Sequence, residues 1–132
     1  TALWFAGKKG PAPQSSAHYC VDATHVIQCV PSDRIAWHAP GANKDGIGIE
    51  LAGYARQSRD EWLDAYSSAM LRPAAKLVRA LSHRHQIPLL FLEESGVIGG
   101  GRGVTTHAVV TRAYRKSTHT DPGPEFPADL LL

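Results

Sequence analysis

Gly101 to Pro127 reads GRGVTTHAVVTRAYRKSTHTDPGPEFP, and the rest of the chain is interpreted around it. The stretch holds His107 and, fourteen positions later, Asp121, which follows His119 in a Thr-His-Thr-Asp-Pro-Gly-Pro run. Imidazole nitrogen and carboxylate oxygen are ligands that zinc takes in a tetrahedral shell. The Pro-Gly-Pro after Asp121 excludes a helix and predicts a stiff loop. We therefore predict that His107 and Asp121 bind a metal, with the remaining ligands supplied from elsewhere.

Composition places the chain among ordinary globular proteins. Its 132 residues predict one domain, spanning residues 1–132, with room for a proper core. The formal net charge of +2 is too small to argue for nucleic acid as a partner. No apolar run approaches the length of a membrane span, and the first residues do not read as a signal peptide. We expect neither nucleic-acid binding nor membrane insertion.

Two cysteines flank a predicted hairpin. His18–Val21 and Val26–Val30 alternate and are rich in β-branched residues, which predicts two strands around a turn. A two-residue turn at Ala23-Thr24 would pair Cys20 with Ile27 rather than with Cys29. We therefore expect two free thiols, which fits a reducing compartment.

The chain starts within an apolar pattern. Thr1 is followed by Ala2–Ala6, which reads as the last turns of a helix that Gly7 and Gly10 would end. This pattern carries no signal for a helix start. We expect part of the fold to precede Thr1.

The remaining elements alternate between strands and helices. Helical spacing follows Tyr54, with Asp60 and Glu61 at its start, and Pro73 is expected to kink this helix or to begin a second one. The other expected elements are strands at Ile47–Leu51 and Pro88–Leu92, a glycine-rich loop at Glu93–Gly103, and helices at Val104–Arg115 and Ala128–Leu132. This order predicts an α/β domain with a mixed central sheet flanked by helices.

Glu50 interrupts the apolar strand Ile47–Leu51. Alternation puts it on the same face as Gly48 and opposite Ile49, so it faces either solvent or a polar cleft. His38, between Trp37 and Ala39 in a loop, is either a surface residue or a functional one.

These fragments fall in a recognisable order. Ser16-Ala17-His18-Tyr19 comes first, followed by Ala36-Trp37-His38-Ala39, Ile47-Gly48-Ile49-Glu50-Leu51, Thr106-His107, Asp121-Pro122-Gly123-Pro124 and Phe126-Pro127. Together they resemble the zinc-dependent N-acetylmuramoyl-L-alanine amidases of the peptidoglycan-recognition-protein type. The resemblance covers nearly the whole chain and is closest to the amidase domain of endolysins from phages that infect mycobacteria.

The resemblance implies roles for individual residues. It implies that His107 and Asp121 bind Zn²⁺ and that Glu50 is catalytic. A basic residue, often lysine, stabilises the oxyanion in relatives at the position held here by His119. Trp37, His38 and Asn43 are expected to contact the glycan or the stem peptide. The family's third zinc ligand is a histidine that nothing in this chain matches, so we expect it upstream of Thr1, with His18 as a less favoured substitute.

The function implied is zinc-dependent hydrolysis of the amide bond between N-acetylmuramic acid and L-alanine in bacterial peptidoglycan, within a phage endolysin. We expect a monomer, made in the host cytoplasm without a signal peptide and acting on the cell wall after release. Two alternatives stay open: a domain of the same fold that binds peptidoglycan without cutting it, and a zinc peptidase that cuts within the stem peptide.

Overall fold

The computed structural model describes residues 14–132. The predicted helical end at Ala2–Ala6 lies outside these residues. The elements are β1 (Tyr19–Val21), β2 (Val26–Gln28), β3 (Ile49–Leu51), α2 (Arg59–Trp62), α3 (Ala65–His85), α4 (Glu94–Ile98), α5 (His107–Tyr114) and the 3₁₀ helix η1 (Ala128–Leu131). Among the described residues, no helix is long and apolar enough to cross a membrane.

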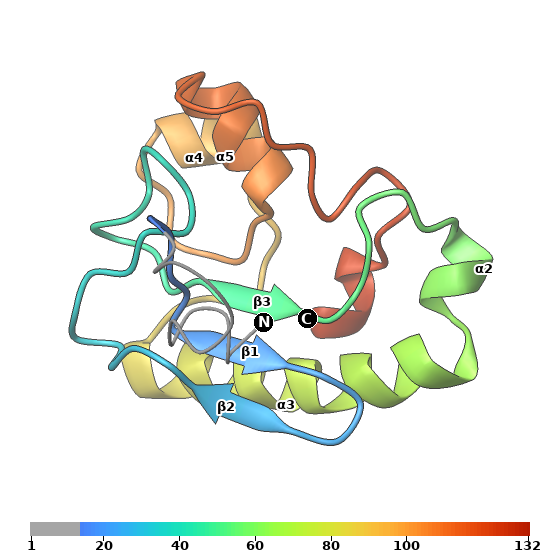
Figure 1. Ribbon diagram of the computed structural model, residues 1–132. Coiled ribbons are helices and arrows are strands. Elements are labelled where there is room, and N and C mark those ends of the chain that lie inside the picture. The colour runs from blue at the N-terminus through green and yellow to red at the C-terminus, as the bar shows by residue number, and fades with distance from the viewer. Residues whose placement is uncertain (1–13) are drawn as a thin grey trace.

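The strands form one sheet in the order β2-β1-β3. β1 pairs antiparallel with β2 and parallel with β3, so the sheet is mixed. α3 runs along one side of the sheet, and α4 and α5 lie on the other side (Figure 1). The predicted α/β fold with a mixed sheet flanked by helices is confirmed.

A carboxylate shapes the turn of the β1–β2 hairpin. Asp22 Oδ1 accepts hydrogen bonds from the backbone N–H groups of Thr24 and His25, both at 2.7 Å. This local bonding satisfies donors that the tight turn would otherwise leave unpaired. The resulting register pairs Cys20 with Ile27, and both cysteines are free, as predicted.

The main core lies between the sheet and α3. Val21 from β1 is 2% exposed and packs in a cluster with Met70 and Ala74 of α3, both 0% exposed. Trp62 closes one end of this cluster, where its ring meets Phe126 edge-on at 4.9 Å between centroids. Successive residues of a strand point to opposite faces of the sheet. This core therefore occupies one face of the sheet, and the candidate site lies on the other.

The break between helices falls earlier than predicted. α3 continues through Pro73 without a new start, so of the two alternatives expected at Pro73 the second helix is wrong, and the kink stays a prediction. The interruption lies instead at Leu63–Asp64, where the Asp64 side chain accepts a hydrogen bond of 2.7 Å from the Ser67 N–H and caps α3. A strong N-cap starts a helix more effectively than an internal proline does.

Two expectations between α3 and α5 are also wrong. Pro88–Leu92 is not a strand, because only Phe91 forms an isolated bridge, to Val104. The predicted loop Glu93–Gly103 contains the helix α4. Val97 of α4 is buried, and this apolar contact stabilises a turn of helix that the glycines disfavour. The predicted helix at Val104–Arg115 is confirmed as α5, and Ala128–Leu132 as η1.

Candidate metal and catalytic site

His107 is the first residue of α5. The side chain of Thr106 caps this helix by accepting a hydrogen bond from the Val109 N–H. Val109 and Val110 are both 3% exposed and hold the helix against the protein. The cap and the buried valines together fix the direction in which the His107 side chain leaves the backbone.

The loop that follows α5 returns to the start of that helix. The Asp121 carbonyl accepts a hydrogen bond of 2.8 Å from the Ala108 N–H, so the loop is tied beside His107. Gly123 then reverses the chain with a φ of +93°, and its N–H donates to the Thr120 carbonyl at 2.9 Å. The prediction of a constrained loop around Asp121 matches this bonding.

Three potential metal ligands converge at this point. Asp121 Oδ2 lies 3.2 Å from His107 Nδ1, and Asp121 Oδ1 lies 3.1 Å from His119 Nδ1. The two imidazole rings stack at 4.4 Å between centroids with an interplanar angle of 18°. One ligand atom from each residue lies within 4.8 Å of the others. The two predicted ligands, His107 and Asp121, therefore lie next to each other, and His119 lies beside them.

This group fits a divalent metal such as zinc. Two imidazoles and one carboxylate form a ligand set that zinc accepts, with a fourth position left for water or substrate. His107 Nε2 is buried and has no hydrogen-bond partner among the residues described. A buried polar atom without a partner is costly, and such atoms recur at functional sites. The group could therefore hold a metal ion.

The pKa values of the two carboxylates near the site, Asp121 and Glu50, shift in opposite directions. The hydrogen bond from His107 is the main reason that the pKa of Asp121 falls to about 2. Burial raises the pKa of Glu50, and the negative charge of Asp121 adds to this effect, while His107 and His119 oppose it. One carboxylate is thus held ionised, as a ligand should be, and the other has a greater tendency to take a proton.

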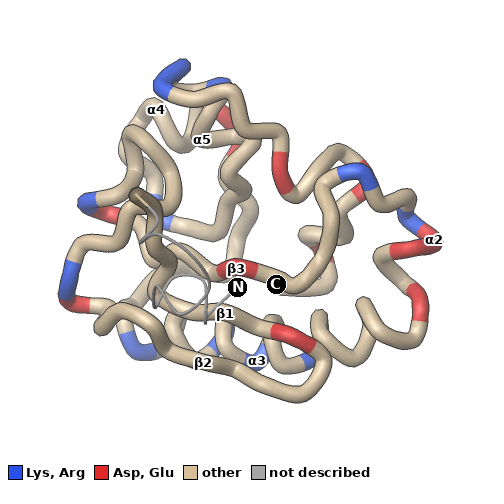
Figure 2. The backbone as a smooth tube through the Cα atoms, viewed as in Figure 1, with Lys and Arg blue, Asp and Glu red and all other residues tan. Residues whose placement is uncertain are grey.

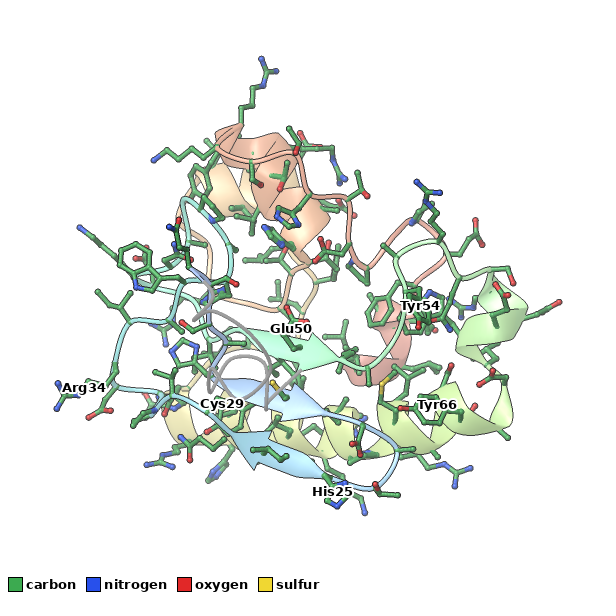
Figure 3. The ribbon with its side chains drawn as sticks, in the orientation of Figure 1. His25, Cys29, Arg34, Glu50, Tyr54 and Tyr66 are labelled. Atoms are coloured by element: carbon green, nitrogen blue, oxygen red, sulfur yellow. The ribbon has the colours of Figure 1, made fainter. Side chains whose placement is uncertain are left out.

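Glu50 faces this group from β3. The charges that act on its pKa include those of Asp121, His107 and His119, which lie close enough to influence its carboxylate. Figure 3 shows Glu50 on the side of β3 that faces α5, and Figure 2 shows acidic residues both on β3 and in the segment after α5. Glu50 is exposed to solvent, and its carboxylate lies on the side of the sheet that carries the His/His/Asp group, so it has both surroundings that the sequence left open.

The residues predicted to contact substrate differ in their solvent exposure and in their hydrogen bonds within the protein. Trp37 is 63% exposed. His38 is half-buried, and its Nε2 lies 3.1 Å from the Gly46 carbonyl. Asn43 Oδ1 accepts hydrogen bonds from the His38 and Ala39 N–H groups at 3.0 and 2.7 Å, so this oxygen shapes the loop.

His18 has a structural role that sequence reasoning did not foresee. It is 1% exposed, and both ring nitrogens are used: Nε2 donates to the Arg34 carbonyl at 2.9 Å, and Nδ1 accepts from the Gly48 N–H at 3.0 Å. These bonds join the loop before His38 to the start of β3. His18 is not part of the metal-ligand group. The spacing of His18 from the other fragments gave no signal of this role.

A groove of about 510 Å³ opens beside His119. It runs between α5 and the segment that carries Asp121. Its lining residues include Thr106, Arg112, Thr118, Pro124 and Phe126.

A mixed sheet flanked by helices, with a His/His/Asp group on the side that Glu50 of β3 faces, defines an α/β domain with a candidate metal site. The chain belongs to the N-acetylmuramoyl-L-alanine amidase family (Amidase_2), whose model matches residues 4–124.

Known proteins similar to the chain include an amidase and a hydrolase. It is 28% identical over 135 aligned residues to N-acetylmuramoyl-L-alanine amidase A of Achromobacter lyticus, with 94% of this chain and 68% of that protein covered. The fold matches that of the Staphylococcus aureus hydrolase AmiA, solved in complex with its ligand, with a TM-score of 0.63 and 18% identity. That match covers 89% of this chain, which spans 57% of the AmiA chain.

Proposed function

We propose that the protein hydrolyses the amide bond between N-acetylmuramic acid and L-alanine in bacterial peptidoglycan, in a zinc-dependent reaction. The observation that carries this proposal is the convergence of His107, His119 and Asp121 opposite Glu50. Membership of the amidase family supports the choice of bond.

His107 and Asp121 would hold the zinc ion. Zinc bound there would polarise the amide carbonyl and lower the pKa of a water molecule. His107 suits a ligand because its side chain is only 15% exposed and its Nε2 has no partner within residues 14–132. Asp121 suits one because its carboxylate stays ionised, with its pKa near 2.

Glu50 and His119 would carry the proton transfer and the charge stabilisation. Glu50, with its raised pKa, would accept a proton from the attacking water and pass it to the departing amine. His119 has a side chain that is 61% exposed, far more open than that of His107. Its imidazole can therefore reach substrate and donate a hydrogen bond to the oxygen on which negative charge develops.

The substrate would extend from this site over the neighbouring surface. Exposed Trp37 offers an apolar face for a sugar ring, and half-buried His38 follows it in the same loop. Asn43 would contribute through its amide nitrogen, since its oxygen is used within the loop. The groove beside His119 would take a further part of the glycan or stem peptide.

Digestion of purified peptidoglycan tests the reaction directly. Mass spectrometry should find stem peptides with a free L-alanine amino group and glycan strands that keep an intact lactyl group. Products cleaved between two amino acids would identify a stem-peptide peptidase instead. Peptidoglycan that is bound but never cleaved by the zinc-loaded protein would identify a binding domain.

Zinc stoichiometry tests the ligand assignments. His107→Ala and Asp121→Ala should each lower zinc affinity by at least about 10-fold. His25→Ala is the matched control, because His25 also contacts an aspartate, Asp22 at 3.3 Å, but lies in the hairpin turn away from the site (Figure 3). His119→Ala should keep zinc and lose activity. Loss of zinc from that variant would make His119 a ligand and overturn its role as oxyanion donor.

We further propose that the chain acts as the lytic domain of an endolysin from a phage that infects mycobacteria. It would work as a monomer, released from the host cytoplasm to the wall. The order of sequence fragments that resembles this group supports the proposal. Peptidoglycan from mycobacteria should be degraded faster than peptidoglycan from unrelated bacteria, and equal rates would remove the proposed host. Sedimentation of the protein should give one species of monomer mass.

A further inference from the structure

Two thiols meet at the edge of the sheet. Cys20 lies in β1, Cys29 follows the end of β2, and their Sγ atoms are 3.7 Å apart. The backbone fixes this approach, because the Cys29 N–H donates a hydrogen bond of 2.8 Å to the His18 carbonyl. Neither sulfur takes part in the proposed amidase chemistry.

The two thiols differ in how reagents can reach them. Cys20 is 7% exposed, whereas Cys29 is half-buried and directly follows the edge strand β2 (Figure 3). Burial raises the pKa of the Cys20 thiol to about 12, with Cys29 as the next cause. Cys20 therefore stays protonated at neutral pH, and Cys29 is the sulfur that a dissolved reagent meets first.

We propose that Cys20 and Cys29 form a modification site, at which a small disulfide of the oxidised-glutathione class installs an intramolecular Cys20–Cys29 bond. The thiolate of Cys29 attacks one sulfur of the reagent, forms a mixed disulfide and releases the first glutathione thiol. Cys20 then attacks the Cys29 sulfur, and its proton leaves with the second glutathione thiol. Two protein thiols are oxidised and one reagent disulfide is reduced to two thiols.

The short distance between the two sulfurs favours the second step over a stable mixed disulfide on Cys29. The sulfurs must close from 3.7 Å to a bond of about 2.05 Å, a movement that small rotations of the two side chains supply. Deprotonation of Cys20 limits this step, because its pKa is high. Formation should therefore be slow near neutral pH and several-fold faster one pH unit higher.

The bond would stabilise the edge strand β2 and leave the proposed active site unchanged. It joins β2 to β1, and all three residues of β2 are exposed, so this edge strand gains a covalent anchor. Glu50 lies opposite Cys20 but belongs to β3, which the bond does not link. The oxidised protein should therefore be more stable and equally active, which suits a protein that leaves a reducing compartment.

Treatment with oxidised glutathione at pH 8 tests the site. Free thiols should fall from two to none, the protein should lose the mass of two hydrogen atoms, and digestion without reductant should yield one peptide pair linked through Cys20 and Cys29. The thermal midpoint should rise by on the order of 5 °C, and reductant should reverse the rise. These readouts do not require amidase activity, so they stand or fall separately from the proposed function.

Matched variants complete the test. Cys29→Ser and Cys29→Ala should show neither the mass change nor the rise in thermal midpoint, and either one serves if the other folds poorly. Activity on peptidoglycan should agree within twofold between the oxidised and reduced forms. A stable glutathione adduct on Cys29 with Cys20 still free, a disulfide-linked dimer, or an internal bond without any rise in the midpoint would each overturn the proposal.

Discussion

The two faces of the three-stranded sheet have opposite characters. On the face toward α3, Val21 packs against Met70 and Ala74 in a core that excludes water. On the other face, Cys20 and Glu50 lie opposite each other, and Glu50 faces the candidate metal group. Successive residues of a strand point to opposite faces, so adjacent positions in one short segment belong to these two environments.

The contrast indicates that residues important for stability and residues proposed for catalysis lie on different faces of the sheet. Ile49 and Leu51 pack toward the core, and Glu50 between them does not. Apolar burial is the main source of folding free energy, whereas an acid with a raised pKa is a poor contributor to it. Substitutions on the two faces should therefore affect different measurements.

Glu50→Gln should have the largest effect. Glutamine keeps the shape but cannot accept the proton, so turnover of the zinc-loaded protein should fall by roughly 10²–10⁴-fold. Glu125→Gln is the control, since Glu125 is exposed in the loop after Asp121. Turnover should be measured with soluble peptidoglycan fragments. Near-normal turnover in a folded, zinc-loaded Glu50→Gln protein would remove Glu50 from the mechanism.

Met70→Ala should show the reverse pattern on the core face. Met70 is 0% exposed, and its truncation should lower the free energy of unfolding by about 2–5 kcal/mol. Turnover per folded molecule should stay within about twofold, because the cavity forms on the far side of the sheet. Tyr66→Ala, one turn earlier in α3 at a residue 51% exposed, should cost far less in urea unfolding. Equal losses in the two variants would contradict the assignment of the core.

Gly123→Ala links the two regions through the Asp121 loop. A Cβ at this position, where φ is +93°, would meet the backbone carbonyl of Ala55. The backbone strain alone should cost about 1–3 kcal/mol. Gly100→Ala is the matched control, because φ there is +71° but nothing lies within 4 Å of an added Cβ. Zinc affinity should fall in Gly123→Ala and stay unchanged in Gly100→Ala, as titration of zinc into both proteins would reveal.

The sequence predicted the fold class and the convergence of His107 with Asp121, for different reasons. Alternation and β-branched residues identified the hairpin, because a half-buried strand leaves that pattern locally. The pairing of His107 with Asp121 as candidate ligands was predicted from ligand chemistry in a constrained loop and from the resemblance to the amidases. The functional roles of all the site residues stay predictions: His107, Asp121, Glu50, His119, Trp37, His38 and Asn43.

What the sequence could not reveal depends on contacts between distant segments. The orientation of Glu50 was undecided, because alternation gives two faces and does not say which one meets the site. The bonds of His18 reach Arg34 and Gly48, and no local pattern encodes them. α4 was missed because its glycines disfavour a helix that a buried valine stabilises in the folded protein.

Thr106→Ala should have a smaller effect, confined to the start of α5. The change removes the side-chain cap on the Val109 N–H, which should cost about 1 kcal/mol of unfolding free energy. Thr106→Ser keeps the hydroxyl and should stay near the parent value in chemical denaturation. His107 adjoins the cap, so a modest loss of zinc affinity should accompany the loss of stability. An Ala variant as stable as the Ser variant would show that the buried valines alone fix α5.

The smallest expected effect tests whether Glu50 costs stability, and it is read in the metal-free protein. Because burial raises the pKa of Glu50 in the folded state, its ionised form is less favourable there than in the unfolded chain. The sign follows: this cost is absent below the unfolded pKa of about 4.3 and fully present above the folded pKa. Metal-free Glu50→Gln should therefore be slightly more stable than the parent at pH 7, and the two should converge as the pH falls toward 4. Urea unfolding at several pH values measures the difference. If the variant is instead less stable at pH 7, the carboxylate makes a favourable contact in the folded protein. Residues on both faces of the sheet would then contribute to the free energy of unfolding.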